Sequence, residues 1–195
     1  MCRLAGGCIE AEENILESTI ARLQHFSVEV SDTDRSIAFY RDVLGFKLTE
    51  RHGAGEVSGI PVELTFMRLH SKHHELVLVH NPRKTYRKRP IRPEDDLDGP
   101  PMFHHFALEC DSREDWLAAM ERAREKGAEI VRGPVLHSWH QAGGDGSWGE
   151  NEAVYILDPD GHRVEIFWGL ATIDPDGTHR TAAGEAVPGS RTEEL

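Results

Sequence analysis

Two segments of this chain repeat one pattern, and the repeat constrains the fold more than any other feature. Residues 23–30 and 103–110 are both strand-like runs, and each carries a histidine at the same place, His25 and His105. The two histidines lie 80 residues apart in the sequence. A repeat on this scale predicts two copies of one structural unit that bury their apolar faces together.

A helical pattern and three further strands follow each of these segments. Residues 32–44 and 112–126 place apolar side chains at helical spacing, and each run ends at a glycine, Gly45 or Gly127. The apolar stripes that should face the sheet are Ile37, Tyr40 and Leu44, and Trp116, Met120 and Ala123. The further strands are expected at 46–51, 62–69 and 74–79, and at 128–132, 153–157 and 162–168.

This order, βαβββ followed by βαβββ, predicts an α+β fold in which two units form one domain with the helices outside the sheet. A chain of 195 residues with 38% hydrophobic content can bury one sizeable core. The expected boundaries are an N-terminal extension at 1–22, a domain at 23–168 with units 23–80 and 103–168 joined by a linker at 81–102, and a C-terminal tail at 169–195.

The last two strands form a predicted hairpin with the turn at residues 158–161. Pro159 presets this turn and Gly161 supplies a positive φ. Strand alternation puts Glu165 and Phe167 on one face, and Val164, Ile166 and Trp168 on the other. A carboxylate among apolar residues needs a wet edge, a salt bridge or a metal.

Glu165 and the two repeated histidines can converge on one point if the two units face each other. A lone histidine such as His25 is more often structural, but the pairing of His25 with His105 in a repeat favours a ligand role for both. Two imidazoles and one carboxylate form the facial ligand set that leaves open positions on Fe(II). The residues themselves therefore suggest a metal site.

Composition excludes several classes of partner. The sequence holds 22 Lys and Arg against 34 Asp and Glu, a net charge of −12, which argues against nucleic acid or an anionic membrane as the main partner. No run approaches 18 apolar residues and no signal peptide is recognisable, so a cytoplasmic protein is the default expectation. Three cysteines without a Cys-x-x-Cys spacing predict neither disulfides nor a zinc ribbon. Exposed sheet edges favour a homo-oligomer.

Three segments outside the repeat have distinct expectations. The linker at 81–102 holds five prolines and a basic cluster, and is predicted to be a solvated loop or else a pocket wall for an acidic substrate. The loop at 138–152 has four glycines beside two tryptophans, which suggests a hinged cover over a site. The tail at 169–195 is poor in large apolar residues and is expected to fray or to lie along another subunit.

Over residues 23–168 the chain resembles the vicinal oxygen chelate superfamily, whose paired βαβββ units form a cupped mixed sheet around a metal site. Within it, the chain is most similar to the small one-module type I extradiol ring-cleavage dioxygenases, the group of catechol 2,3-dioxygenase and dihydroxybiphenyl dioxygenase. The resemblance implies that His25, His105 and Glu165 are the ligands of Fe(II), or alternatively Mn(II). It also implies a catecholic substrate from aromatic catabolism, with O2 as the second substrate.

Three more positions match that family. His74, before an acidic and an aliphatic residue, matches the acid/base histidine; His137, after a Gly-Pro pair, matches the histidine that faces dioxygen. Tyr155, ten residues before Glu165, matches the tyrosine that is hydrogen-bonded to the substrate. For Tyr155 to share a sheet face with Glu165, the connecting loop must be odd in length or bulged, so an irregular turn is expected at 158–161.

Two alternatives remain open. If Glu75 is aligned with Glu165 by the repeat, the chain becomes a glyoxalase-I-like metal-dependent isomerase or lyase, with Glu75 as a fourth ligand beside His25, His105 and Glu165 on Ni(II) or Zn(II). Strand parity allows only one of His74 and Glu75 to face the metal. The other alternative is a metal-free ligand-binding module of the same fold. His137 and Tyr155, together with His74, form a proton-handling set that oxygen activation requires, which favours His74 over Glu75 as the residue that faces the metal and favours the dioxygenase over the isomerase.

Overall fold

The computed structural model describes residues 22–87, 97–98 and 101–187. The first unit consists of β1 (Phe26–Glu29), α1 (Thr33–Asp42), β2 (Lys47–His52), β3 (Glu63–Arg68) and β4 (Leu76–His80). The second consists of β5 (Phe106–Glu109), α2 (Arg113–Glu125), β6 (Glu129–His137), β7 (Asn151–Leu157) and β8 (Arg163–Trp168). Three short strands follow, β9 (Thr172–Ile173), β10 (His179–Arg180) and β11 (Ala186–Val187). The predicted α+β fold of two βαβββ units is confirmed.

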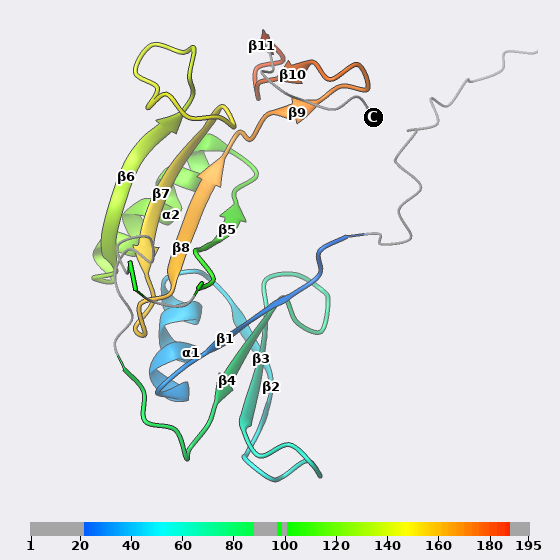
Figure 1. Cartoon of the computed structure of the whole chain (residues 1–195), viewed down its shortest axis with the longest axis vertical. Helices are drawn as coiled ribbons and strands as arrows, with labels where there is room; N and C mark the ends of the chain where they lie inside the picture. Colours follow the sequence, from blue (N-terminus) through cyan, green and yellow to red (C-terminus); the bar gives the residue numbers. More distant parts are fainter. Residues whose placement is uncertain (1–21, 88–96, 99–100, 188–195) are drawn as a thin grey trace, which may run out of the picture.

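Each unit folds its strands into a separate four-stranded mixed sheet, and the two sheets have the same topology (Figure 1). The strand order is β1-β4-β3-β2 in the first unit, hereafter the first module, and β5-β8-β7-β6 in the second module. The first strand of each module pairs in parallel with the last, and the remaining pairs are antiparallel. The internal repeat therefore extends from sequence to hydrogen-bonding pattern.

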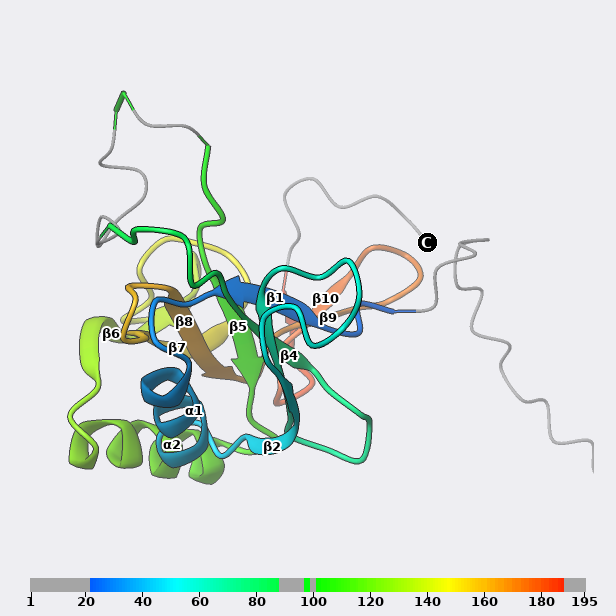
Figure 2. The same ribbon diagram turned by 90° about the horizontal axis from the view of Figure 1, so that it is seen from below.

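The two helices begin at polar caps and cover the same side of the molecule (Figure 2). Asp32 accepts a hydrogen bond from the amide of Arg35, and Ser112 accepts one from the amide of Asp115, which satisfies amides that the first helical turn leaves free. Five of the six residues of the predicted apolar stripes are buried, with Tyr40 and Ala123 fully so, and Ile37 is partly buried against the core. One continuous core joins α1, α2 and the inner faces of both sheets.

The face of each sheet turned away from the helices is called the cup face here. In the second module its residues include Ala153, Tyr155 and Phe167, which form a small apolar cluster apart from the main core. Glu165 alternates with Val164 and Ile166, both of which belong to the main core, so Glu165 shares the cup face with Phe167. The predicted parity of β8 is therefore confirmed.

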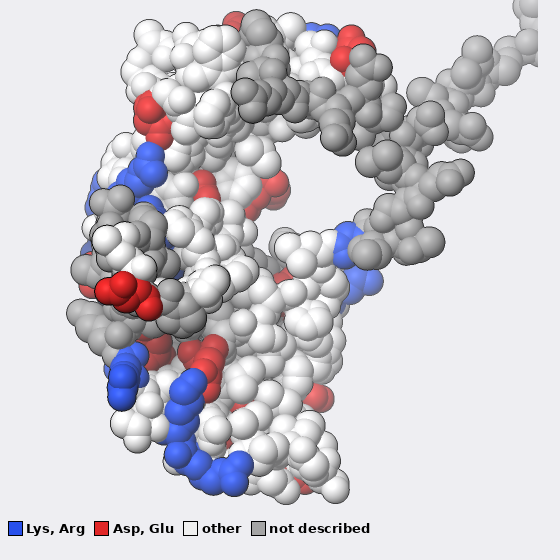
Figure 3. All heavy atoms as spheres, viewed as in Figure 1, with Lys and Arg blue, Asp and Glu red and all other residues white. Residues whose placement is uncertain are grey.

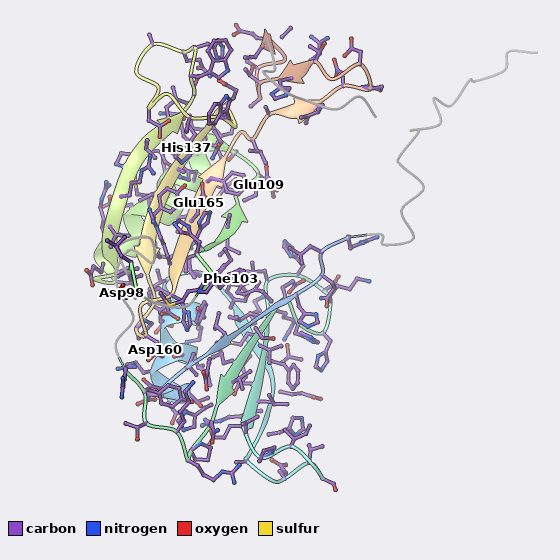
Figure 4. All side chains as sticks on the ribbon, in the orientation of Figure 1. Asp98, Phe103, Glu109, His137, Asp160 and Glu165 are labelled. Carbon is purple, nitrogen blue, oxygen red and sulfur yellow. The ribbon has the colours of Figure 1, made fainter. Side chains whose placement is uncertain are left out.

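Polar contacts, of which one is buried, and a contact between two phenylalanine rings cross the seam between the modules. The Phe26 and Phe106 rings, which open β1 and β5, lie 4.1 Å apart between centroids. The Tyr40 hydroxyl of α1 donates to Asp158 Oδ2 of the second module over 2.9 Å. Asp160 accepts hydrogen bonds from the amide of Ser31 and from Arg35, at the junction visible in Figure 4. The starts of the two repeated strands are therefore neighbours.

Two segments differ from expectation. β6 continues to His137, where the sequence suggested a strand ending at 132 and then an irregular segment. The ladder to β7 shifts register on both sides of Arg132, and Gly133 (φ +95°) lies so close to β7 that a Cβ there would meet the carbonyl oxygen of Ala153 at 2.7 Å. This glycine lets the strand kink and still pair, which carries the ladder as far as His137.

The predicted fraying of the tail is wrong for residues 170–187. They form the three-stranded sheet β9–β10–β11, with Val187 buried, and the amide of Ala171 donates to the carbonyl of Gly149. Short turns with Gly177 and Gly184 at positive φ supply this structure where large apolar side chains are scarce. Residues 1–21, the linker positions 88–96 and 99–100, and residues 188–195 lie outside the described part of the chain.

Across the described ranges, no helix combines the length and apolar character needed to cross a bilayer.

Candidate active site

Tyr155 and Glu165 lie directly opposite each other on the cup face of the second module. They are register partners in an unshifted β7–β8 ladder that closes with Leu157 opposite Arg163. The loop between these strands is therefore five residues long, 158–162, an odd number, as the shared face requires. Asp158 accepts hydrogen bonds from the amides of Asp160 and His162 within it, which fixes the turn.

His105 and Glu165 form the centre of the site. His105 Nε2 lies 3.1 Å from Glu165 Oε2, and the Glu165 side chain is 9% exposed. Two donors bound at right angles to one metal at about 2.1 Å each lie roughly 3 Å apart, so this pair fits a divalent cation. Burial lowers the pKa of His105, although the Glu165 carboxylate acts in the opposite direction. A neutral imidazole is the form that a metal ligand requires.

His25 is held in the same way as His105 but lies at the start of the first module. His25 Nδ1 is 2.7 Å from the Gln24 amide oxygen, and His105 Nδ1 is 2.5 Å from the His104 ring. In both modules the preceding residue thus engages Nδ1 and leaves Nε2 for another partner. The sequence analysis missed these roles of Gln24 and His104, although a polar residue directly before each repeated histidine was a signal.

The structure does not bring all three predicted ligands together. The His25 ring lies against His74, with 4.7 Å between centroids, and within 22–87, 97–98 and 101–187 no group of three His, Cys, Asp or Glu side chains is placed to hold a metal ion. Two of the three donors, His105 and Glu165, are assembled. The third belongs to the other module, whose first strand is a neighbour through Phe26 and Phe106.

His74 lies among aromatic rings on the cup-face side of the first module. Its ring is 5.0 Å from Phe66 and its Nδ1 is 2.8 Å from His73 Nδ1. Burial and the neighbouring His25 imidazole lower the pKa of His74, so it is neutral and can accept a proton near neutral pH. Of the predicted proton-handling groups, His74 lies with His25, and the other two lie with Glu165.

His137 and Tyr155 form a hydrogen-bonded chain beside Glu165. His137 Nε2 lies 2.8 Å from the Tyr155 hydroxyl and 3.9 Å from Glu165 Oε1. Burial and the Glu165 carboxylate raise the pKa of Tyr155 well above its ordinary value, so the phenol keeps its proton at neutral pH. The predicted pair therefore shares one end of the site with the carboxylate.

Asp145, which the sequence analysis did not single out, orients His137 from behind. Its Oδ2 lies 2.9 Å from His137 Nδ1 and accepts a 2.6 Å bond from Arg132. An ionised carboxylate only accepts, so the imidazole proton lies on Nδ1 and Nε2 accepts from Tyr155. Although burial opposes it, hydrogen bonds from Ser147 and from His137 lower the pKa of Asp145 to about 2. No sequence signal locates Asp145. Its position beside His137 depends on the path of the loop at 138–144, which brings the carboxylate back to the imidazole.

Glu75 is engaged away from this chemistry. Its Oε2 accepts a 2.9 Å bond from the amide of Leu69, and its Oε1 lies 3.7 Å from His70 Nδ1. The register also shows that the repeat alignment of Glu75 with Glu165 is wrong. Ser27 and Ala107 are equivalent positions of the repeat, two residues after His25 and His105; Ser27 pairs with Val77, and Ala107 pairs with Glu165. On the other side of the same strands, Val77 pairs with Phe66, and Glu165 pairs with Tyr155. The residue equivalent to Glu165 is therefore Val77.

A cavity of about 370 Å³ adjoins Glu165 on the second module. The described residues that line it are Ala107, His137, Ser147, Trp148, Asn151, Tyr155, Glu165, Phe167 and Leu170. Figure 3 shows an indented surface on the right side of the molecule, with acidic atoms on the part formed by the second module. Figure 4 shows Glu165 and Glu109 on this side of the second module. A larger cavity of about 450 Å³, between Arg35, Lys126 and Asp160, contains none of the predicted site residues.

Comparisons with known proteins show a family and several relatives that the chain resembles. Residues 22–166 match the family model of the Glyoxalase/Bleomycin resistance protein/Dioxygenase superfamily. The chain is 27% identical over 152 residues to biphenyl-2,3-diol 1,2-dioxygenase of Metapseudomonas furukawaii, across 78% of this chain and 42% of that protein. It is 28% identical over 150 residues to a probable lactoylglutathione lyase of Synechocystis sp., across 74% of this chain and 92% of that protein.

Among solved structures, a glyoxalase I variant from Zea mays aligns with a TM-score of 0.53 at 23% identity, covering 75% of this chain and 44% of that one. Similarity at this identity shows a shared fold. The chain spans less than half the length of the biphenyl-diol dioxygenase that it matches.

Proposed function

The chain belongs to the Glyoxalase/Bleomycin resistance protein/Dioxygenase superfamily, and on this premise we propose that it is an Fe(II)-dependent extradiol dioxygenase. Such an oxidoreductase cleaves a catechol-type ring and incorporates both atoms of O2. His25, His105 and Glu165 would hold the metal, with Mn(II) as the alternative to Fe(II). The metal, when bound, supplies adjacent positions that hold the diol and O2 side by side.

The observation that carries the proposal is the register of the two modules. A second carboxylate ligand would have to stand at the place equivalent to Glu165, and Val77 stands there. Under this proposal the donor set is therefore two imidazoles and one carboxylate, the set that leaves three positions open. A catechol needs two of these positions and dioxygen needs one.

The proton-handling residues support the same reaction. His74, with its lowered pKa, is the candidate that takes the proton of a substrate hydroxyl and later returns one. His137, its tautomer set by Asp145, would stabilise negative charge that grows on oxygen, and Tyr155 would orient the substrate through its hydroxyl. An isomerase with a glutamate base would not require this set.

Metal binding would also draw His25 to the pair formed by His105 and Glu165. Each imidazole is already held at Nδ1, which leaves Nε2 available, and β1 and β5 start beside each other. The free energy of binding a third ligand can close the remaining separation, because metal binding and local folding are coupled. Loading with metal should therefore stabilise the contact between the modules.

The competing function is a glyoxalase-I-like isomerase, which is supported by the similarity of the chain to a probable lactoylglutathione lyase. It requires Glu75 as a ligand, yet the Glu75 carboxylate bonds the Leu69 amide. A metal-free ligand-binding module is the further alternative, and direct measurement of bound metal excludes or establishes it.

The test is metal analysis of protein purified and loaded without oxygen, followed by a panel of catechols with O2. We expect about one Fe(II) per chain and a yellow ring-cleavage product. A hemithioacetal substrate serves as the parallel assay for isomerase activity, and Glu75→Gln serves as the variant that separates the two functions.

Under the dioxygenase proposal Glu75→Gln keeps its iron and its ring-cleavage activity. Loss of metal in Glu75→Gln, together with isomerisation of the hemithioacetal by the unaltered protein, would replace the proposal with the four-ligand isomerase.

A further inference from the structure

The loop at 138–150 joins β6 to β7 at the top of the second module in Figure 1, and it carries two of the groups that hold His137. Asp145 Oδ2 and Ser147 Oγ each lie 2.9 Å from His137 Nδ1. The tautomer and the direction of this imidazole therefore depend on where the loop places residues 145–147.

Glu150, the last residue of this loop, combines two costly features. Its backbone has φ +58°, and it is the only residue other than glycine with a positive φ in the part of the chain that the structure describes. Its side chain carries a carboxylate and yet is 2% exposed. Backbone strain and a buried charged group each cost free energy, and strained residues of this kind occur mainly at functional sites. Glycine would adopt this backbone without strain, so what glutamate adds here is its buried carboxylate.

The Glu150 carboxylate joins the end of the loop to its beginning. Its Oε2 accepts a 2.7 Å hydrogen bond from Gln141 Nε2, and its Oε1 lies 3.2 Å from His140 Nδ1. The carbonyl of Gln141 in turn accepts from the amide of Gly144 over 3.0 Å, which closes the turn directly before Asp145. The carboxylate of Glu150 is therefore connected to Asp145 through the Gln141 side chain and this turn.

The turn also packs closely against the first residue of the loop. A Cβ at Gly144 would meet the carbonyl oxygen of Ser138 at 2.2 Å, and the same carbonyl accepts from the amide of Gly146 over 2.9 Å. In a segment packed this closely, a shift of the turn cannot be absorbed locally and would move Asp145 away from His137.

We propose that Glu150 is a positioning residue, which pins the turn at 141–144 and so holds Asp145 in place against His137. This inference rests on the proposed dioxygenase function and adds to it a residue outside the proposed ligands and proton-handling groups. Because none of the three proposed ligands belongs to this loop, the effect of Glu150 should appear in kcat and leave the amount of bound iron unchanged.

The first test compares Glu150→Gly, Glu150→Ala and Glu150→Gln in iron-loaded protein with catechol and O2. Glycine and alanine both remove the carboxylate, so both should lower kcat by roughly ten- to a hundredfold, the cost of a misplaced group, with KM and bound iron nearly unchanged. Glycine also relieves the backbone strain, so Glu150→Gly should unfold at a higher temperature than Glu150→Ala. Glu150→Gln should keep most of kcat, because its amide oxygen can still accept from Gln141. Activity should therefore follow the side chain, whereas stability should follow the backbone.

A double-mutant cycle tests whether Glu150 acts through Asp145. If it does, Glu150→Ala combined with Asp145→Asn should lower kcat little more than Asp145→Asn alone, because the two changes interrupt one connection. Hydrogen exchange measured by mass spectrometry should show faster exchange of residues 138–147 in Glu150→Ala and an unchanged β7–β8 ladder. The matched control is Glu185→Ala, which removes an exposed glutamate from the same cavity of about 210 Å³ that Glu150 lines and should alter neither measurement.

Losses that multiply in the double variant, or a kcat that is higher in Glu150→Gly than in Glu150→Ala, would overturn the positioning role, while ring cleavage by the unaltered protein would leave the proposed function standing. If the unaltered, iron-loaded protein cleaves no catechol, the dioxygenase proposal itself fails, and the role of Glu150 in turnover fails with it.

Discussion

The two modules share one hydrogen-bonding pattern and differ at two facing positions. The first module has Phe66 opposite Val77 on its cup face, and the second has Tyr155 opposite Glu165 at the same places. The first pair is apolar, whereas the second carries a carboxylate and a hydroxyl that continue into His137 and Asp145. The repeat thus supplies a common scaffold, and substitution at equivalent positions gives one module most of the polar site.

The histidines before the first strands are the feature that the modules keep in common. His25 and His105 are each held at Nδ1 by the residue before them. What differs is the partner of Nε2, which for His105 is Glu165. The comparison teaches that a histidine position, here a proposed metal ligand, can persist in both copies of a repeat while the carboxylate is present in only one.

The largest effect should come from removing the carboxylate of the second module. Glu165→Gln is expected to lose most bound iron and nearly all ring-cleavage activity, because the amide cannot replace an anionic ligand. The matched control is Val77→Gln, which places the same amide at the equivalent position of the first module and should keep its iron. Metal analysis and circular dichroism of both variants decide the matter. Stoichiometric iron in folded Glu165→Gln would contradict the proposed ligand set.

The next effect tests the contribution of the first module to proton transfer. His74→Phe should still bind iron and catechol but turn over more slowly by roughly 10²–10⁴-fold, the range of general acid–base groups. Stopped-flow measurement of binding and turnover separates these steps. His70→Phe alters a nearby exposed histidine as the control. An unchanged turnover rate in His74→Phe would remove this residue from the mechanism.

A smaller effect is expected when the hydroxyl of either Tyr40 or Tyr155 is removed, and the two variants should differ in whether stability or activity changes more. The Tyr40 hydroxyl is buried and donates to Asp158 across the seam, so Tyr40→Phe should lower the free energy of unfolding by about 1–3 kcal/mol, as expected when a buried acceptor loses its donor. Tyr155→Phe should change stability less and activity more, because its hydroxyl serves the site. Urea unfolding and kinetic assays of both variants test this contrast. Equal effects on stability would show that the tyrosines do not differ in role.

The smallest effect concerns acid stability of the loop behind His137. The pKa of Asp145 is lowered to about 2 from an ordinary value of 3.8, so its contribution to stability is present above pH 4 and is lost as the pH falls towards 2. The loss should reach about 2 kcal/mol at most. Asp145→Asn should remove this part of the pH dependence, whereas Glu121→Gln, at an exposed position, should not. Unfolding measured at pH 7, 4 and 2.5 would show the difference, and identical profiles would contradict it.

The sequence alone determined the βαβββ repeat and the apolar stripes of both helices, because local periodicity is carried directly by a sequence. The shared face of Tyr155 and Glu165 was expected from the family resemblance, since the expected strand bounds left an even loop of four residues. Tyr40 and Trp116 are buried as their spacing predicted, and the five-residue loop at 158–162 satisfies the parity condition.

Only the tertiary structure decided which residue of the first module is equivalent to Glu165, and it is Val77 rather than Glu75. Pairing between strands is set by hydrogen bonds across the sheet, and a shift of two residues leaves the alternating pattern unchanged. The same reason applies to Asp145, which reaches His137 through the path of a loop, and to the sheet formed by residues 172–187. Local periodicity does not encode where a loop returns, because that depends on which backbone and side-chain groups find hydrogen-bond partners once the core has formed.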